Sequence, residues 1–99
     1  MKEMRVMTVC GAGVGTSTLL RMNVADVFKS LNLPYSVHVE NTSLSRARGT
    51  RCDLMITFES FKDEAEKCGV PVIYIKNLMD KSEIREKVKD FAENWANKD

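Results

Sequence analysis

The residues best suited to chemistry form a glycine-rich segment near the start of the chain, Cys10-Gly11-Ala12-Gly13-Val14-Gly15-Thr16-Ser17. Three glycines within five residues allow the backbone to curl so that several N–H groups point inward, and such a nest fits a tetrahedral dianion. Cys10 opens the segment, so its sulfur would lie at the centre of those donors, where a thiolate is stabilised. A thiolate in an anion nest suits phosphoryl transfer, which depends mainly on positioning and charge stabilisation. We expect no metal and no other cofactor.

A strand and a helix must hold this segment in place. Arg5-Val6-Met7-Thr8-Val9 is short, β-branched and apolar, which is typical of a buried parallel strand. After Gly15, apolar residues recur with the spacing of one helical face and predict a helix over 17–31, capped by Thr16 or Ser17. Ligands of open α/β sheets bind at the carboxyl ends of central strands, and a helix N-terminus lowers a cysteine pKa from about 8.5 to roughly 3.5–7.5. The segment is therefore the leading candidate site.

The rest of the chain supplies the other elements of the fold. In chain order these are an edge strand at 35–40, a strand at 52–57, a short helix at 62–67, a strand at 72–75 and a helix at 81–96. The polar segment 41–51 predicts a short helix or turn at most. Strands that alternate with helical segments imply right-handed crossovers. We expect one α/β domain over 1–99, a small doubly wound fold with a four-stranded parallel sheet in the order 2-1-3-4 and helices on both faces.

Composition excludes several classes of protein. Apolar residues make up 43% of the chain and charged residues 29%, a globular balance, and the formal charge of +1 offers no single-sign run that would attract nucleic acid. The apolar stretches fall far short of the roughly 20 residues of a membrane-spanning helix, so we expect no insertion into a membrane. The first residues lack the apolar region of about 7 to 15 residues of a secretory signal, which predicts a cytoplasmic protein.

The glycine-rich segment resembles that of the B-component family of bacterial sugar phosphotransferase systems, and the resemblance covers almost the whole chain. The pattern C-G-x-G-x-G-[ST]-[ST] is met by Cys10, Gly11, Gly13, Gly15, Thr16 and Ser17. In that family, a cysteine that ends the first strand is transiently phosphorylated. The glycine-rich form looks most like the ascorbate and galactitol branch, and the end of segment 72–79, Lys76-Asn77-Leu78-Met79, looks closer to the ascorbate members.

The resemblance implies a relay with two protein partners. A phosphohistidine on an A component would give its phosphoryl group to Cys10, which would give it to a sugar, L-ascorbate, held by a membrane C component. The chain would then be a phosphotransferase that associates peripherally with a membrane transporter. The resemblance further implies that main-chain N–H groups from Gly11 through Ala12, Gly13, Val14, Gly15 and Thr16 to Ser17 hold the phosphate, with the hydroxyls of Thr16 and Ser17 as further donors.

Three other functions fit parts of the pattern. A small cysteine phosphatase uses a similar loop, but it needs an arginine six residues after the cysteine, where this chain has Thr16. A phosphocysteine sensor that acts on a regulator would carry the same loop, and the sequence does not separate it from a transport subunit. A dinucleotide-binding turn is a third alternative, with Glu40 as the ribose-binding acid, but 99 residues leave little room for it.

The remaining reactive residues have simpler interpretations. Cys52 and Cys68 are expected to be structural, because one starts an apolar strand and the other precedes a glycine that ends a helix. His38 is an alternative phosphoryl acceptor, but it is far in sequence from the glycines and is expected on an exposed edge strand. Three arginines, Arg46, Arg48 and Arg51, suit either a docking patch for an acidic partner or a solvated loop. Phe58-Glu59-Ser60-Phe61 follows the third strand and would rim the site, with both aromatic rings buried or available to a partner.

Overall fold

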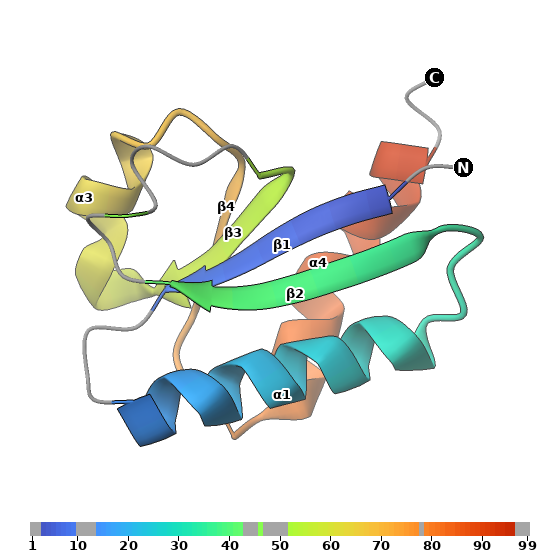
Figure 1. The fold of residues 1–99 in the computed structure, drawn as a ribbon, viewed down its shortest axis with the longest axis horizontal. Helices are drawn as coiled ribbons and strands as arrows, with labels where there is room; N and C mark the ends of the chain where they lie inside the picture. The colour runs from blue at the N-terminus through green and yellow to red at the C-terminus, as the bar shows by residue number, and fades with distance from the viewer. Residues whose placement is uncertain (1–2, 10–13, 43–45, 47–51, 78, 97–99) are drawn as a thin grey trace.

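The computed structural model describes residues 3–9, 14–42, 46, 52–77 and 79–96, and Figure 1 shows a sheet with helices packed against it. The elements are β1 (Glu3–Val9), α1 (Val14–Ser30), β2 (Ser36–Thr42), β3 (Leu54–Phe58), the 3-10 turn η1 (Glu59–Phe61), α3 (Lys62–Glu66), β4 (Val72–Ile75) and α4 (Lys81–Ala96). This order confirms the predicted α/β class.

The strands form one parallel sheet in the order β2-β1-β3-β4, as the sequence predicts. β1 is central, and its last residues lie opposite both neighbours: Val9 faces Thr42 of β2, and Thr8 faces Ile56 of β3. Because the strands are parallel, their carboxyl ends meet at one edge of the sheet. The arrows of β1, β2 and β3 point to that edge at the left of Figure 1, where α1 begins and α3 lies.

The main core lies between one face of the sheet and the two long helices. Buried side chains of α1 and α4, which contact each other, pack on those of the strands. The buried members are Met4, Val6, Leu20, Val24, Val27, Phe28, Leu54, Ile56, Ile75, Ile84, Val88 and Ala92. The apolar faces that the helical spacing predicts for 17–31 and 81–96 are thereby confirmed.

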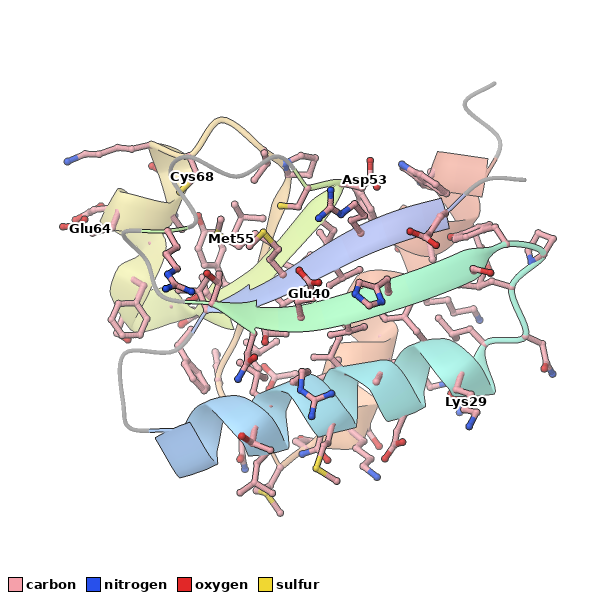
Figure 2. The ribbon with its side chains drawn as sticks, in the orientation of Figure 1. Lys29, Glu40, Asp53, Met55, Glu64 and Cys68 are labelled. Atoms are coloured by element: carbon pink, nitrogen blue, oxygen red, sulfur yellow. The ribbon has the colours of Figure 1, made fainter. Side chains whose placement is uncertain are left out.

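A smaller cluster covers the other face of the sheet beneath α3. Its buried members are Val9, Met55 and Ala65, and the half-buried Cys52 and Cys68 pack against them. Met55, on β3, and Cys68, just after α3, are labelled in Figure 2. Helices therefore lie on both faces, which makes the sheet doubly wound.

The structure corrects several predicted boundaries. Helix α1 begins at Val14, so Thr16 and Ser17 lie inside its first turn and neither caps it. Gly15 is helical in spite of its low propensity, because the buried face of the helix stabilises the whole element. Strand β2 includes Asn41 and Thr42, which the polarity of 41–51 assigned to a short helix or turn. Residues 43–45 and 47–51 of that segment lie outside the described residues.

Strand β3 begins two residues later than the sequence predicts. The backbone N–H of Arg5 donates to the Asp53 carboxylate at 2.8 Å, and the N–H of Asp53 donates to the Arg5 carbonyl at 2.8 Å. Asp53 therefore pairs with β1 partly through its side chain, and regular strand geometry starts at Leu54. Cys52 precedes the strand and does not start it.

Candidate functional site

The predicted site spans the connection between β1 and α1. Cys10, Gly11, Ala12 and Gly13 lie outside the described residues, as do the side chains of Val14, Thr16 and Ser17. The two flanking elements are described: β1 ends at Val9 and α1 begins at Val14. The chain leaves β1 toward β2 and then crosses to β3 on the opposite side, so this edge is the topological switch point of the sheet. Ligands of open α/β sheets bind at such points.

Threonine side chains near the end of β1 donate hydrogen bonds across to the neighbouring strands, and one of them binds the last carbonyl of β1. On the β3 side, the Thr57 hydroxyl donates to the carbonyl of Val9 at 2.9 Å, and Thr57 is 0% exposed. On the β2 side, the Thr8 hydroxyl donates to the carbonyl of Glu40 at 3.3 Å. The last peptide before Cys10 is therefore fixed by a side-chain hydrogen bond. Sequence reasoning missed both threonines, because only the strand register shows which carbonyl each can reach.

The first turn of α1 presents hydrogen-bond donors toward the same connection. A helix that begins at Val14 leaves the N–H groups of Val14, Gly15 and Thr16 without an acceptor inside the helix. The aligned peptides of this 17-residue helix also give its N-terminus a partial positive charge. Such an end stabilises an anion that binds next to it. The N–H of Ser17 is the first that the regular i to i−4 ladder engages, which makes it a weaker candidate donor than the three before it.

Phe58 and the turn η1 continue from β3 at the same edge. Phe58 is half-buried and packs against the main core, and Phe61 is also half-buried. Glu59 and Ser60, between them, are exposed. Neither aromatic residue is fully buried or fully exposed.

The connection between β4 and α4 is fixed at this edge by the carboxylate of Glu83. It accepts hydrogen bonds from the backbone N–H groups of Lys76 and Asn77 at 3.1–3.2 Å, and from the ammonium of Lys87 at 3.1 Å. Although burial raises the pKa of Glu83, the hydrogen bonds from Asn77, Lys87 and Lys76 outweigh it and hold the pKa below its ordinary value. The Asp80 carboxylate caps α4 by accepting from the N–H of Glu83 at 3.1 Å. Asp80 and Glu83 have the spacing of a capping box, but only the Asp80 cap forms, while the Glu83 carboxylate binds the preceding loop.

A small apolar patch lies beside these connections. The large hydrophobic side chains that the described part of the chain leaves exposed are Leu19, Met22 and Met79, at 45%, 49% and 63%. The Asn23 amide nitrogen lies 4.0 Å from the Met79 sulfur, which places Met79 against α1. Sequence reasoning overlooked the patch, although Leu19 and Met22 fall off the buried helical face and were therefore identifiable. The edge beside the predicted site is in part apolar.

Cys52 and Cys68 are partly buried and pack against the smaller core cluster beneath α3. Burial raises the pKa of the Cys52 thiol, and the neighbouring Asp53 carboxylate adds to the effect. A raised pKa keeps the thiol protonated and unreactive. The Cys68 sulfur lies 3.9 Å from the Glu64 carbonyl, within the cluster under α3. These surroundings agree with the structural role predicted for both residues.

His38 and Arg46 lie on the surface. His38 is exposed on the edge strand β2, as predicted, and its Nε2 lies 2.9 Å from Glu40 Oε1. Arg46 is exposed, whereas Arg48 and Arg51 lie outside the described residues. His38 pairs with Arg5 of β1 in the strand register, four residues before the end of that strand. A histidine in that place is not a neighbour of the β1–α1 connection.

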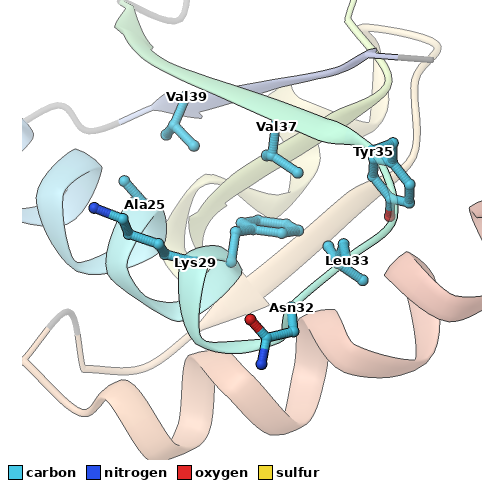
Figure 3. Close-up of a pocket in the computed structure, with 8 residues that line it drawn as sticks. Ala25, Lys29, Asn32, Leu33, Tyr35, Val37 and Val39 are labelled. Carbon is cyan, nitrogen blue, oxygen red and sulfur yellow. The ribbon is translucent and has the colours of Figure 1, made fainter. Parts of the chain in front are cut away.

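A groove of about 420 Å³ lies between α1 and β2 (Figure 3). Its lining is mostly apolar and includes Val37, Val39, Leu33 and Phe28, with the polar side chains of Lys29 and Asn32 also among its lining residues. Ala25 to Asn32 belong to the last turns of α1 and the residues that follow it. The groove therefore lies toward the opposite end of α1 from the predicted site.

Comparisons with known proteins agree with one another. A family model for the lactose/cellobiose-specific IIB subunit of the PTS system matches residues 5–90. The chain is 28% identical over 88 residues to the ascorbate-specific PTS system EIIB component of Mycoplasma pneumoniae, covering 86% of this chain and 90% of that protein. Among solved structures, the lactose-specific IIB component domain from Streptococcus pneumoniae superposes with a TM-score of 0.59 at 19% identity, covering 97% of each chain. That structure has the same fold.

Proposed function

Because this chain belongs to the IIB-subunit family of sugar phosphotransferase systems, we propose that Cys10 is the residue on which it carries a phosphoryl group. IIB subunits are phosphotransferase components that work with IIA and IIC components. The finer assignment of the acceptor residue rests on the site described above, and that of the donor and the sugar rests on the resemblance and the relatives.

The position of Cys10 between two described elements carries the proposal. It directly follows Val9, the last residue of the central strand, and comes four residues before Val14, where α1 begins. The free N–H groups of the first helical turn favour negative charge at this place, both on a thiolate and on a bound phosphoryl group. By contrast, the pKa of Cys52 is raised by burial, which argues against that thiol as the acceptor.

The first transfer moves the phosphoryl group from nitrogen to sulfur. The Cys10 thiol loses its proton, the thiolate attacks phosphorus on the phosphohistidine of the A component, and the P–N bond breaks as the S–P bond forms. The departing imidazole nitrogen takes up one proton, so the net change exchanges a thiol proton for a phosphoryl group. The glycines of the loop and the N–H groups of Val14, Gly15 and Thr16 hold the phosphoryl oxygens during this step.

The second transfer moves the group from sulfur to oxygen. A hydroxyl of the sugar on the membrane C component attacks phosphorus, the S–P bond breaks, and the Cys10 thiolate leaves. The hydroxyl proton is lost to a base, so the thiolate returns to its starting state. Thr16 occupies the place at which a cysteine phosphatase has its arginine, so water attack on the S–P bond lacks the clamp that would speed it. The relay therefore keeps its phosphoryl group until a sugar arrives.

We assign L-ascorbate as the sugar. The glycine-rich loop resembles the ascorbate and galactitol branch, and the Lys76-to-Met79 segment looks closer to its ascorbate members. The curated relative from M. pneumoniae is named ascorbate-specific. The chain would reach the membrane only by docking on the C component. Within the described residues, no helix has both the length and the hydrophobicity to cross a bilayer.

A reconstituted relay tests the function and the substrate together. Membrane vesicles that carry the C component are mixed with phosphorylated A component, this chain and one of four sugars, L-ascorbate, galactitol, lactose or cellobiose. We expect sugar phosphate from L-ascorbate with the wild-type chain and with a Cys68→Ser control, and none with Cys10→Ser. Sugar phosphate formed by Cys10→Ser at the wild-type rate would overturn the role of Cys10. Preference for another sugar would overturn the ascorbate assignment alone.

A further inference from the structure

The hydrogen bond from Thr57 to Val9 has a consequence for the residue that follows Val9. The pairing of β1 with β3 runs from Val6 opposite Leu54 to Thr8 opposite Ile56. One residue farther on, the Thr57 hydroxyl reaches across and donates to the Val9 carbonyl at 2.9 Å. A side chain thus extends the contact between the two strands as far as the last peptide of β1.

The carbonyl of Val9 belongs to the same rigid group as the backbone of Cys10. The peptide unit is planar, so the C=O of one residue and the N–H and Cα of the next lie in one plane. A hydrogen bond that fixes the direction of the Val9 carbonyl therefore restrains the plane from which the Cys10 side chain departs. The restraint acts at the one covalent link between the central strand and the predicted nucleophile.

We propose that Thr57 is a positioning residue for Cys10, which holds the Val9–Cys10 peptide so that the sulfur stays next to the helix N-terminus. The proposal rests on the function assigned above to Cys10. A displacement of about 1 Å can cost roughly 100-fold in rate when reacting groups must be aligned. The loss of one restraint on this peptide is expected to lower the transfer rate by about tenfold, within that limit.

The Thr57 hydroxyl is buried and makes a specific hydrogen bond, so it does not merely fill space in the core. Thr57 is 0% exposed at the end of a β-strand, where valine would have the same shape and no polar atom to satisfy. A buried hydroxyl without a partner is costly, and here the partner is the Val9 carbonyl. The hydrogen bond can therefore be removed by Thr57→Val with little change in packing, and Thr57→Ser keeps the hydroxyl while it removes the methyl group.

Thr8 provides a matched control. Its hydroxyl is also buried, at 1% exposed, and also donates to a carbonyl of a neighbouring strand, that of Glu40 at 3.3 Å. That carbonyl lies in β2 and is not part of the peptide that carries Cys10. Thr8→Val removes this longer, part-buried hydrogen bond from the same end of the sheet without releasing the Val9 carbonyl.

The test measures the reactivity of Cys10 in the whole chain, first without any partner. The rate of alkylation by iodoacetamide is followed against pH, and the Cys10 peptide is quantified by mass spectrometry so that Cys52 and Cys68 do not contribute. We expect Thr57→Val to shift the Cys10 profile to higher pH, because a misplaced thiolate loses helix and amide donors. Thr57→Ser and Thr8→Val should keep the wild-type profile.

The same four proteins are then compared for phosphoryl uptake from the A component. Uptake should fall about tenfold in Thr57→Val and stay near wild type in Thr57→Ser and Thr8→Val. If Thr57→Val does not fold, Thr57→Ala is compared with Thr57→Ser. An unchanged profile and unchanged uptake in the variant that lacks the hydroxyl would overturn the proposal, as would an equal loss in Thr8→Val. A wild-type chain that takes up no phosphoryl group would instead contradict the proposed function, while the alkylation profile would still decide the role of Thr57.

Discussion

The carboxylate of Glu83 should make an outsized contribution to stability for a residue so near the surface. It accepts hydrogen bonds from the backbone N–H groups of Lys76 and Asn77 and from the Lys87 ammonium. The Glu83 side chain is 17% exposed. Hydrogen bonds to a charged group contribute about 1.5–3 kcal/mol each when they are buried. Lys76 and Asn77 are exposed, so water can replace part of what is lost. We therefore expect Glu83→Ala to lower the free energy of unfolding by about 2 kcal/mol in total.

The loss should be visible in thermal unfolding. For a domain of this size, about 1 kcal/mol corresponds to a shift in Tm of roughly 4–8 °C, so Glu83→Ala should lower Tm by roughly 10 °C. Glu86, an exposed residue on the same helix, provides the control, because surface substitutions stay within about 0.5 kcal/mol. Equal Tm values for Glu83→Ala and Glu86→Ala would refute the reasoning.

The Glu83 carboxylate should also make the free energy of unfolding depend on pH, in a direction that its lowered pKa determines. The pKa of Glu83 is lowered in the folded state, so its contribution is fully present above the ordinary glutamate pKa of about 4.3. It is lost as the pH falls through the lower folded-state pKa. Glu83→Gln does not titrate, so the difference in unfolding free energy between wild type and this variant should be constant above about pH 5.5 and shrink below about pH 4.3. A difference that grows on acidification would contradict the assignment.

Three further predictions concern the loop, the core and a turn. Gly13→Val should lower phosphoryl uptake without unfolding the chain, because a side chain would fill the anion nest; unchanged uptake would remove the loop from the mechanism. Tyr35→Phe should lower the free energy of unfolding in urea by about 1 kcal/mol, because the Tyr35 hydroxyl donates to the Ala92 carbonyl at 2.9 Å; equal stability would show that this bond contributes nothing. Gly69 has φ of 72° and open space where a Cβ would lie, with no atom within 4 Å, so Gly69→Ala should cost about 1 kcal/mol through backbone strain and Gly69→Asn less; equal costs would point to another cause.

The sequence predicts the elements whose pattern depends on a buried face. Helix α4 and strand β4 have the predicted bounds, because Ile84, Val88 and Ala92 mark a face that only a helix produces and 72–75 is a continuous apolar run. The alternation of strands and helical segments predicted a parallel sheet, which is confirmed, as is the predicted strand order. The start of α1 was predicted three residues too late, because local propensity treats Gly15 as a breaker and tertiary packing overrides it.

In the candidate site, too, local sequence patterns could be predicted, whereas contacts between distant residues could not. Cys10 and its glycines stand out in the sequence by their types and spacing. Their role stays a prediction, because the described residues include the strand before them and the helix after them but not Cys10 to Gly13. Thr57 could not be found in this way, because its partner lies 48 positions away in the chain and depends on the register of β1 with β3. Glu83 follows Asp80 with the spacing of a capping box, yet its carboxylate binds the loop before the helix, a contact set by how β4 and α4 approach each other.

The most direct test of the account is to locate the phosphoryl group. The wild-type chain is incubated with phosphorylated A component, its mass is checked for a gain of about 80 Da, and the modified peptide is identified by mass spectrometry. We expect one phosphoryl group on the peptide that contains Cys10 and no gain in mass in Cys10→Ser under the same conditions. A phosphoryl group found on the peptide of His38, Cys52 or Cys68, with Cys10 unmodified, would contradict it.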